Sequence, residues 1–453
     1  MQIKNALTRY YPEIQKALDA LIGGGDPDDP GEFTPGAKLP ELTPAMRSYL
    51  DASTVALTSL SGYRGRNLSL LDLTLNPATN TTKTFASLII VARAVRFIQD
   101  TGERVTIITP SSANKATALR DAVLRAVEAG LVRADQLNIV VLVPAGATHK
   151  LRATELSRNP ELRARNPIAV YDGDSADFVK TIARAVVDEH KDAVEKSART
   201  HLWYTMRLEN YLVADVIRAF AEADVMDGDG PRLHVHAVSS AFGLLGHAYG
   251  RELLGDTAGP PSRYLLVQHL AAPDMVTSLL GNGDSRPSYV FDPGSGLYTQ
   301  HDNDHFPTRT HDPDEVLDPT FYTRNPATSP RMNALIRAHG GSGIVVSLAE
   351  CLERYGLVRS ILAEAGVRMP ANPMLLQEWS LVMAMTGALN AVDRRLVTDT
   401  DLVVHGAGMY ARGGFEALGA GELHAVKDTS DLRELVLRAS AHQDHDDAYA
   451  LRA

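Results

Sequence analysis

The sequence predicts an α/β protein of three-layer domains, in which parallel sheets are covered by helices. Three observations lead to this expectation. Short apolar runs rich in Val, Ile and Leu alternate along the chain with longer segments of helical periodicity. The helical segments are long enough to serve as the crossover connections that parallel strands require. Turns rich in Ser, Thr, Asn and Gly follow several of the apolar runs, as they do at the carboxyl ends of strands in open α/β sheets.

Length and composition narrow the class of protein. The 453 residues, 44% of them apolar and 22% charged, suffice for two or three folded domains. The net charge of −10 includes no basic block, so we expect neither a nucleic acid nor a membrane as partner. A single cysteine, Cys351, excludes an intramolecular disulfide and should fill space in the core. No secretory signal is visible at the N-terminus, and together these features favour a cytoplasmic protein.

The elements of the first half follow in order along the chain. A helix should begin the chain, followed by a linker, because residues 23–40 are dense in Gly, Pro and Asp. The main body starts near residue 42. The pattern then predicts helix 82–101, strand 104–109, helix 114–129, strand 138–143, strand 168–171, helix 175–190 and a long helix 203–223.

The second half repeats the alternation around one irregular segment. The pattern predicts strand 233–238, helix 243–254, strand 264–267, a helix from about residue 273, helices 348–365 and 377–392, and strand 401–404. Residues 282–329 lack clear periodicity and are expected to form an irregular insertion. Its polar cluster is either a metal-binding group, a polar loop, or a set of substrate-contacting lid residues: His301, Asp302, Asp304, His305, His311 and Asp312. We assign no metal site.

Three turns are candidates for binding an anion. They span residues 76–84, 109–118 and 239–246, and each follows a strand or opens a helix with small or hydroxyl residues. Helix N-termini present unpaired N–H groups at such turns. We therefore expect a ligand that carries phosphate or carboxylate.

The first two turns resemble those of one enzyme family. The run L-N-P-A-T-N-T-T-K-T-F, which includes Lys83, resembles the N-P-T-G-S-F-K-D-R motif of pyridoxal-phosphate (PLP) enzymes of the tryptophan-synthase-β/threonine-synthase superfamily, fold type II. Lys83 takes the place of the lysine that forms the Schiff base. The run P-S-S-A-N-K-A-T-A-L is similar to S-S-G-N-T-G-A-A-L, which implies that Asn114 bonds the cofactor's ring hydroxyl and that Ser111 or Ser112 holds the substrate carboxylate. Thr82 and Lys115 are further candidate substrate contacts.

Two later segments extend the resemblance. V-S-S-A-F-G-L-L-G is similar to the phosphate loop P-S-G-N-F-G-N-L of threonine synthases, and V-V-H-G-A-G is similar to V-L-T-G-H-G, which places His405 at the pyridine nitrogen. The phosphate would lie on the N–H groups of five consecutive residues: Ser239, Ser240, Ala241, Phe242 and Gly243. Alanine at 113, 116 and 241 and histidine at 405 depart from the family pattern, which points to an atypical member.

The resemblance implies a domain plan and an activity. An N-terminal helix and linker, residues 1–40, would precede a large PLP-binding domain, residues 41–84 and 232–453, into which a smaller mobile domain, residues 85–231, is inserted. The cofactor would lie between the two lobes of a homodimer. The expected function is a threonine-synthase-like β- or γ-elimination or replacement on a small amino acid, catalysed by a PLP-dependent lyase or synthase of a specialised biosynthetic pathway. Alternatives are a serine/threonine dehydratase, a cysteine-synthase-like enzyme, and a catalytically silent binding protein with the same fold.

Overall fold

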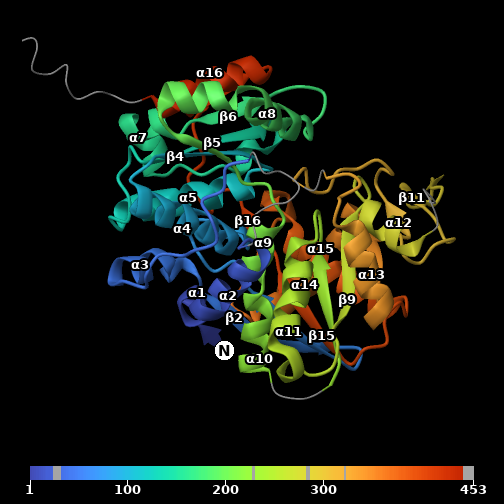
Figure 1. Cartoon of the computed structure of the whole chain (residues 1–453). Coiled ribbons are helices and arrows are strands. Elements are labelled where there is room, and N and C mark those ends of the chain that lie inside the picture. The colour runs from blue at the N-terminus through green and yellow to red at the C-terminus, as the bar shows by residue number, and fades with distance from the viewer. Residues whose placement is uncertain (24–31, 227–229, 282–285, 321–322, 442–453) are drawn as a thin grey trace, which may run out of the picture. The chain divides into compact units, whose positions relative to one another are not determined.

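The computed structural model describes residues 1–23, 32–226, 230–281, 286–320 and 323–441 (Figure 1). The chain forms two compact units. Unit 1 comprises Met1–Leu21, Leu50–Ala86 and Leu208–Glu416, and unit 2 comprises Ile22–Tyr49, Ser87–Arg207 and Ala417–Ala453. In the described part of the chain, no helix is long and apolar enough to cross a membrane.

Unit 1 is built on a seven-stranded sheet with the order β1-β2-β3-β15-β8-β9-β13. Neighbours from β3 to β13 pair in parallel, whereas β1, β2 and β3 pair antiparallel. The bounds of these strands are β1 Gln2–Ile3, β2 Val55–Tyr63, β3 Arg66–Asp72, β8 Arg232–Ala237, β9 Arg263–His269, β13 Gly341–Val346 and β15 Asp401–Gly406. The helices of this unit are α1 Ala6–Arg9, α2 Tyr11–Leu21, α9 Glu209–Asp215, α10 Ile217–Val225, α11 Phe242–Leu254, α12 Asp274–Leu280, α13 Ser329–His339, α14 Leu348–Ala363 and α15 Ser380–Asp393.

Alternating side chains bury both faces of this sheet. On β9, Leu265 and Val267 face a core shared with α14 and α15, while Tyr264 and Leu266 face a second core shared with α11, α12 and α13. Because successive strand residues point to opposite faces, one apolar run fills both cores. Unit 1 is thus a three-layer α/β structure, as predicted.

Unit 2 contains a five-stranded, all-parallel sheet with the order β17-β6-β5-β4-β7. Its strands are β4 Val105–Pro110, β5 Leu137–Pro144, β6 Ile168–Tyr171, β7 His201–Tyr204 and β17 Leu423–Val426. The helices are α3 Pro44–Tyr49, α4 Lys83–Thr101, which begins in unit 1, α5 Asn114–Glu128, α6 Glu155–Arg158, α7 Pro160–Arg165, α8 Phe178–Ala198 and α16 Thr429–Ser440. Helices α8 and α16 lie together on one face of the sheet (Figure 1), where they pack on Ile108, Val140 and Leu142.

Some predicted elements were wrong. The long helix predicted at 203–223 is instead strand β7 followed by α9 and α10. The cause is a contact distant in sequence: Trp203, which is 1% exposed, pairs with Ile107 at the edge of the unit 2 sheet. The segment 282–329, predicted to be irregular, contains a small antiparallel sheet of β10 Val290–Asp292, β11 Leu297–Thr299 and β12 Arg309–Thr310; its residues 282–285 and 321–322 lie outside the described residues.

Other elements were not predicted. The β2–β3 hairpin turns at Arg64 and Gly65, both with positive φ, as the tight turns that suit twisted hairpins require. Strand β13 and helix α13 were also missed, as was a short antiparallel pair, β14 Leu376–Glu378 and β16 Tyr410–Ala411. The glycines and serines of G-G-S-G at the start of β13 hide its strand pattern.

The two units also differ from the predicted domain boundaries. Residues 22–49 and 417–453 group with unit 2, where β17 pairs with β6 and extends the sheet. Residues 208–231 group with unit 1, because α9 and α10 pack against α11. This packing is close: a Cβ on Gly246 would lie 2.3 Å from the Cβ of Asp215.

Candidate functional site

Lys83 is the first residue of α4, and its side-chain amine is chemically unusual. In the described part of the chain, the amine makes no hydrogen bond or ion pair. It lies 5.7 Å from the ring centroids of both Tyr211 and Phe242, which stack on each other at 4.7 Å. Burial lowers the pKa of Lys83; the Asp215 carboxylate opposes this shift and the Arg218 guanidinium adds to it. A larger fraction of the amine is therefore unprotonated and nucleophilic near neutral pH.

The N-terminus of α11 lies in the same unit. Ala241, the residue before the helix, adopts the left-handed conformation with φ 53° and ψ 20°. Among the described residues, no protein acceptor faces the N–H groups of Ser239, Ser240, Phe242 or Gly243. These donors and the helix dipole fit an anion such as phosphate. The turn predicted to hold the phosphate thus has the donors that this role requires.

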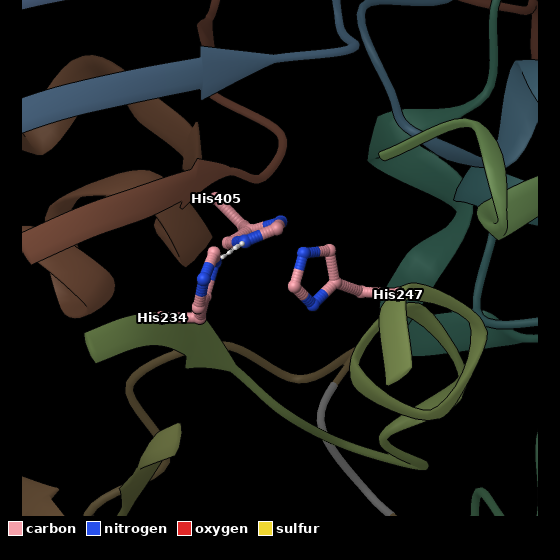
Figure 2. Close-up of side chains that lie close together, drawn as sticks. All are labelled: His234, His247 and His405. Atoms are coloured by element: carbon pink, nitrogen blue, oxygen red, sulfur yellow. Dashed lines mark hydrogen bonds between the residues drawn. The ribbon is translucent and has the colours of Figure 1, made fainter. Parts of the chain in front are cut away.

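A buried chain of hydrogen bonds begins close to this turn. Arg218 Nη1 donates to His405 Nδ1 at 3.2 Å. Because arginine only donates, His405 is neutral with its proton on Nε2, which donates to His234 Nδ1 at 2.9 Å (Figure 2). His234 Nε2 then donates to Ser262 Oγ at 3.1 Å. Both ring nitrogens of His405, the residue expected at the pyridine nitrogen, therefore have protein partners.

A third histidine, from α11, completes the group. Figure 2 shows its ring facing those of His234 and His405, which come from strands β8 and β15. His247 Nε2 lies 2.8 Å from Glu222 Oε2, and its Nδ1 lies 2.9 Å from the Tyr264 hydroxyl. Arg232 donates to the other oxygen of Glu222 at 2.9 Å.

These contacts keep the imidazoles neutral. Burial lowers the pKa of His234 to about 3 and lowers those of His236 and His405 well below the usual range, with neighbouring cationic groups contributing. The pKa of His247 is also lowered, mainly by burial, although Glu222 opposes the shift. Burial alone would raise the pKa of Glu222, but its histidine and arginine partners lower it below its ordinary value, so this residue is a carboxylate.

The ligand atoms of the three histidines in Figure 2 lie within 4.8 Å of one another, near the spacing that a metal ion needs. Each lone pair already accepts a hydrogen bond: His405 Nδ1 from Arg218, His234 Nδ1 from His405, and His247 Nδ1 from Tyr264. A metal would have to replace these bonds. The group is satisfied without an ion, and we treat it as a hydrogen-bonded network.

One nearby histidine was missed by sequence reasoning and differs from the others. His236 stacks on His405 with ring centroids 3.8 Å apart. It is 5% exposed, and its Nε2 has no hydrogen-bond partner in the described structure. A buried polar atom of this kind calls for an explanation, and a ligand can supply the missing partner. The signal was available, because two histidines, His234 and His236, interrupt an otherwise apolar strand on alternate positions.

The remaining predicted residues belong to unit 2, apart from Thr82, which precedes Lys83 and is half-buried. Asn114 begins α5 and is half-buried, as is Ser112. Ser111 Oγ accepts the backbone N–H of Ala116 at 2.8 Å. Lys115 is buried and contacts the sulfur of Met206.

The polar cluster of the insertion does not converge on a common point. His301, Asp302, Asp304, His311 and Asp312 are exposed. His305 Nδ1 donates to the carbonyl oxygen of Gly343 at 2.7 Å, so this nitrogen already has a protein partner. Within the described residues, the histidines of Figure 2 are the group with ligand-like spacing.

Solved structures share this fold. The chain is similar to PLP-bound threonine synthase from Brucella melitensis, with a TM-score of 0.53 and 12% identity over 95% of this chain and 89% of that one. It also matches a fungal L-serine ammonia-lyase from Rhizomucor miehei, with a TM-score of 0.48 and 13% identity over 79% and 95% of the two chains. The first likeness confirms the predicted fold type II.

Sequence comparison leads to a family whose function is open. No curated protein matches the sequence. A family model described as "Family of unknown function (DUF6002)" matches residues 2–440. The chain therefore belongs to the DUF6002 family, and it carries the fold of PLP-dependent threonine synthase.

Proposed function

We propose that this chain is a PLP-dependent enzyme that catalyses elimination or replacement on a small amino acid, with Lys83 as the cofactor-binding lysine. The amine of Lys83 carries the proposal: it lacks an ion-pair partner in the described structure, and burial lowers its pKa. Structural lysines are commonly solvated or ion-paired, whereas an amine that must attack an aldehyde has to be unprotonated.

The residues around Lys83 fit the cofactor. The free N–H groups at the N-terminus of α11 would hold its phosphate. The unpartnered Nε2 of His236 would bond a polar atom of the ring, and His405 would support His236 by stacking. Asn114 is proposed for the ring hydroxyl, and Ser111, Ser112, Lys115 and Thr82 for the substrate, on the resemblance alone.

The chemistry divides between cofactor and protein. When bound, PLP supplies an electron sink for a carbanion at the substrate's α-carbon. Lys83 would hold the cofactor through its aldehyde, and its amine, once displaced by the substrate amine, would be the base that accepts the α-proton. With that electron sink, a leaving group on Cβ could depart directly, whereas a leaving group on Cγ could depart only after a second proton is removed from Cβ. Addition of water or another nucleophile would then give a lyase or synthase outcome.

Reconstitution with PLP tests this proposal. The purified chain should develop a visible absorption band on addition of PLP, and Lys83→Ala should abolish it. Lys196→Ala, which removes an exposed lysine, should leave it unchanged. A chain that is colourless once unbound PLP has been removed would overturn the proposal. Spectral changes with O-phosphohomoserine, O-acetylserine, serine and threonine would then identify the substrate class.

A further inference from the structure

Arg218 is a buried cation with one unpaired end. It lies in α10 and is 4% exposed. Its Nε donates to Asp215 Oδ1 at 2.6 Å, and its Nη1 donates to His405 Nδ1 at 3.2 Å. In the described part of the chain, no acceptor lies within hydrogen-bond distance of its Nη2. An acceptor supplied by a ligand would therefore complete the hydrogen bonding of this side chain.

The unpaired end of Arg218 lies against the first turn of α11. A Cβ built on Gly243 would be 3.2 Å from Nη2 and 3.3 Å from the central carbon of the guanidinium. The guanidinium is therefore packed on the backbone where the unpaired N–H groups of the helix begin. Lys83 is close enough for the charge of Arg218 to lower its pKa. All of these residues belong to unit 1.

Two partners hold the guanidinium in this orientation. Asp215 fixes Nε from α9, and His405 fixes Nη1 from β15, so the side chain cannot turn without breaking two buried contacts. A planar guanidinium matches the oxygens of a phosphate group, and a full positive charge beside a helix N-terminus favours a dianion over a neutral group.

We propose that Arg218 is a charged ligand for a phosphate group bound at the N-terminus of α11, with Asp215 and His405 as positioning residues. The inference rests on the proposed function, since the phosphate is taken to be that of the cofactor. It also accounts for the altered turn: the left-handed Ala241 and its neighbour Ser240 give a stiffer loop than one with glycine, and a charged side chain compensates for it.

The test compares two probes that differ only in the phosphate. Binding of PLP and of pyridoxal to the full chain would be measured by the absorption change and by borohydride trapping on Lys83. In Arg218→Gln, affinity for PLP should fall about 10- to 100-fold, the loss expected for a charge-assisted hydrogen bond, while affinity for pyridoxal should change little. Arg232→Gln, which alters a half-buried, ion-paired arginine of unit 1, should leave the PLP-to-pyridoxal ratio unchanged. An unchanged ratio in Arg218→Gln would overturn the inference.

A second probe separates this inference from the proposed function. Binding of inorganic phosphate to Lys83→Ala, followed by phosphorus NMR, does not need the lysine. Phosphate binding that disappears in Lys83→Ala/Arg218→Gln supports the Arg218 site even if PLP never bonds to Lys83. Equal phosphate binding in both variants contradicts it. Should Arg218→Gln fail to fold because Asp215 is left unpaired, Asp215→Asn/Arg218→Gln removes both charges and tests the same ratio.

Discussion

Mild acid should destabilise unit 1 strongly, because its buried histidines are neutral when folded. The folded-state pKa values of His234, His236 and His405 lie far below the value of about 6.5 expected in an unfolded chain. At pH values between the two, the unfolded state binds protons that the folded state does not, so stability is full at about pH 7.5 and falls as the pH decreases through 6.5. Each such histidine lowers the free energy of unfolding by about 1.4 kcal/mol between pH 7.5 and pH 5.5, and the three together lower it by about 4 kcal/mol.

This loss is large beside the total stability of a typical domain, about 5–15 kcal/mol. It can be measured by urea unfolding at several pH values with the fluorescence of Trp379, which is buried in the unit 1 core. The chain has two tryptophans, so Trp203→Phe leaves a signal from unit 1 alone. We expect unfolding near pH 5.5 to take up about 2.5 protons more than it does near pH 7.5.

Single substitutions test the origin of this pH dependence. His236→Gln should reduce the proton uptake by about one, because it removes one titrating group while leaving the bond between His234 and His405 intact. The exposed control His301→Gln should not alter the uptake. A pH-independent free energy of unfolding between about pH 7.5 and 5.5 would refute the reasoning, since it would mean that the folded state accommodates the protons.

Three further predictions concern packing, backbone strain and reactivity. Gly246→Ala should destabilise unit 1 by about 2–3 kcal/mol, because the new Cβ would overlap Asp215. Gly356→Ala, at an exposed and open position of α14, should instead stabilise it by up to about 1 kcal/mol. Urea denaturation compares the two variants, and equal effects would contradict the close approach of α9 to α11. Ala241→Gly should raise the urea midpoint by an amount equivalent to about 1 kcal/mol, since it relieves a left-handed alanine, and a lower midpoint would count against that conformation. Burial raises the pKa of the Cys351 thiol, so a thiol reagent should react with it slowly in the folded chain and rapidly in urea; fast reaction in buffer would show that Cys351 is accessible.

The sequence was sufficient for the architecture because the relevant signals are local. Apolar runs such as β5 and β9 and the helical pattern of α4 depend on neighbours along the chain, and the structure confirms the three-layer parallel arrangement. Strand β7 was missed because His201–Tyr204 becomes a strand only through pairing with β4, a contact distant in sequence. Domain boundaries also depended on distant pairing, as the addition of β17 to the unit 2 sheet shows.

The candidate site was predictable only in part, for the same reason. The turn at Ser239 to Gly243 and the start of α4 at Lys83 carry their own sequence patterns. Arg218 and Asp215 lie in no recognisable sequence pattern. They join the site only because α9 and α10 pack against Gly243 and Gly246 of α11. The role of His405 also depends on partners from other elements, which occupy both of its ring nitrogens.

The most direct test of the account is the identity of the lysine that bonds to PLP. The chain would be incubated with PLP, reduced with borohydride, digested, and mapped by mass spectrometry. We predict that the modified peptide contains Lys83, because its amine is unpaired in the described structure and its pKa is lowered. Labelling of exposed lysines such as Lys196, with Lys83 unmodified, would contradict the central claim.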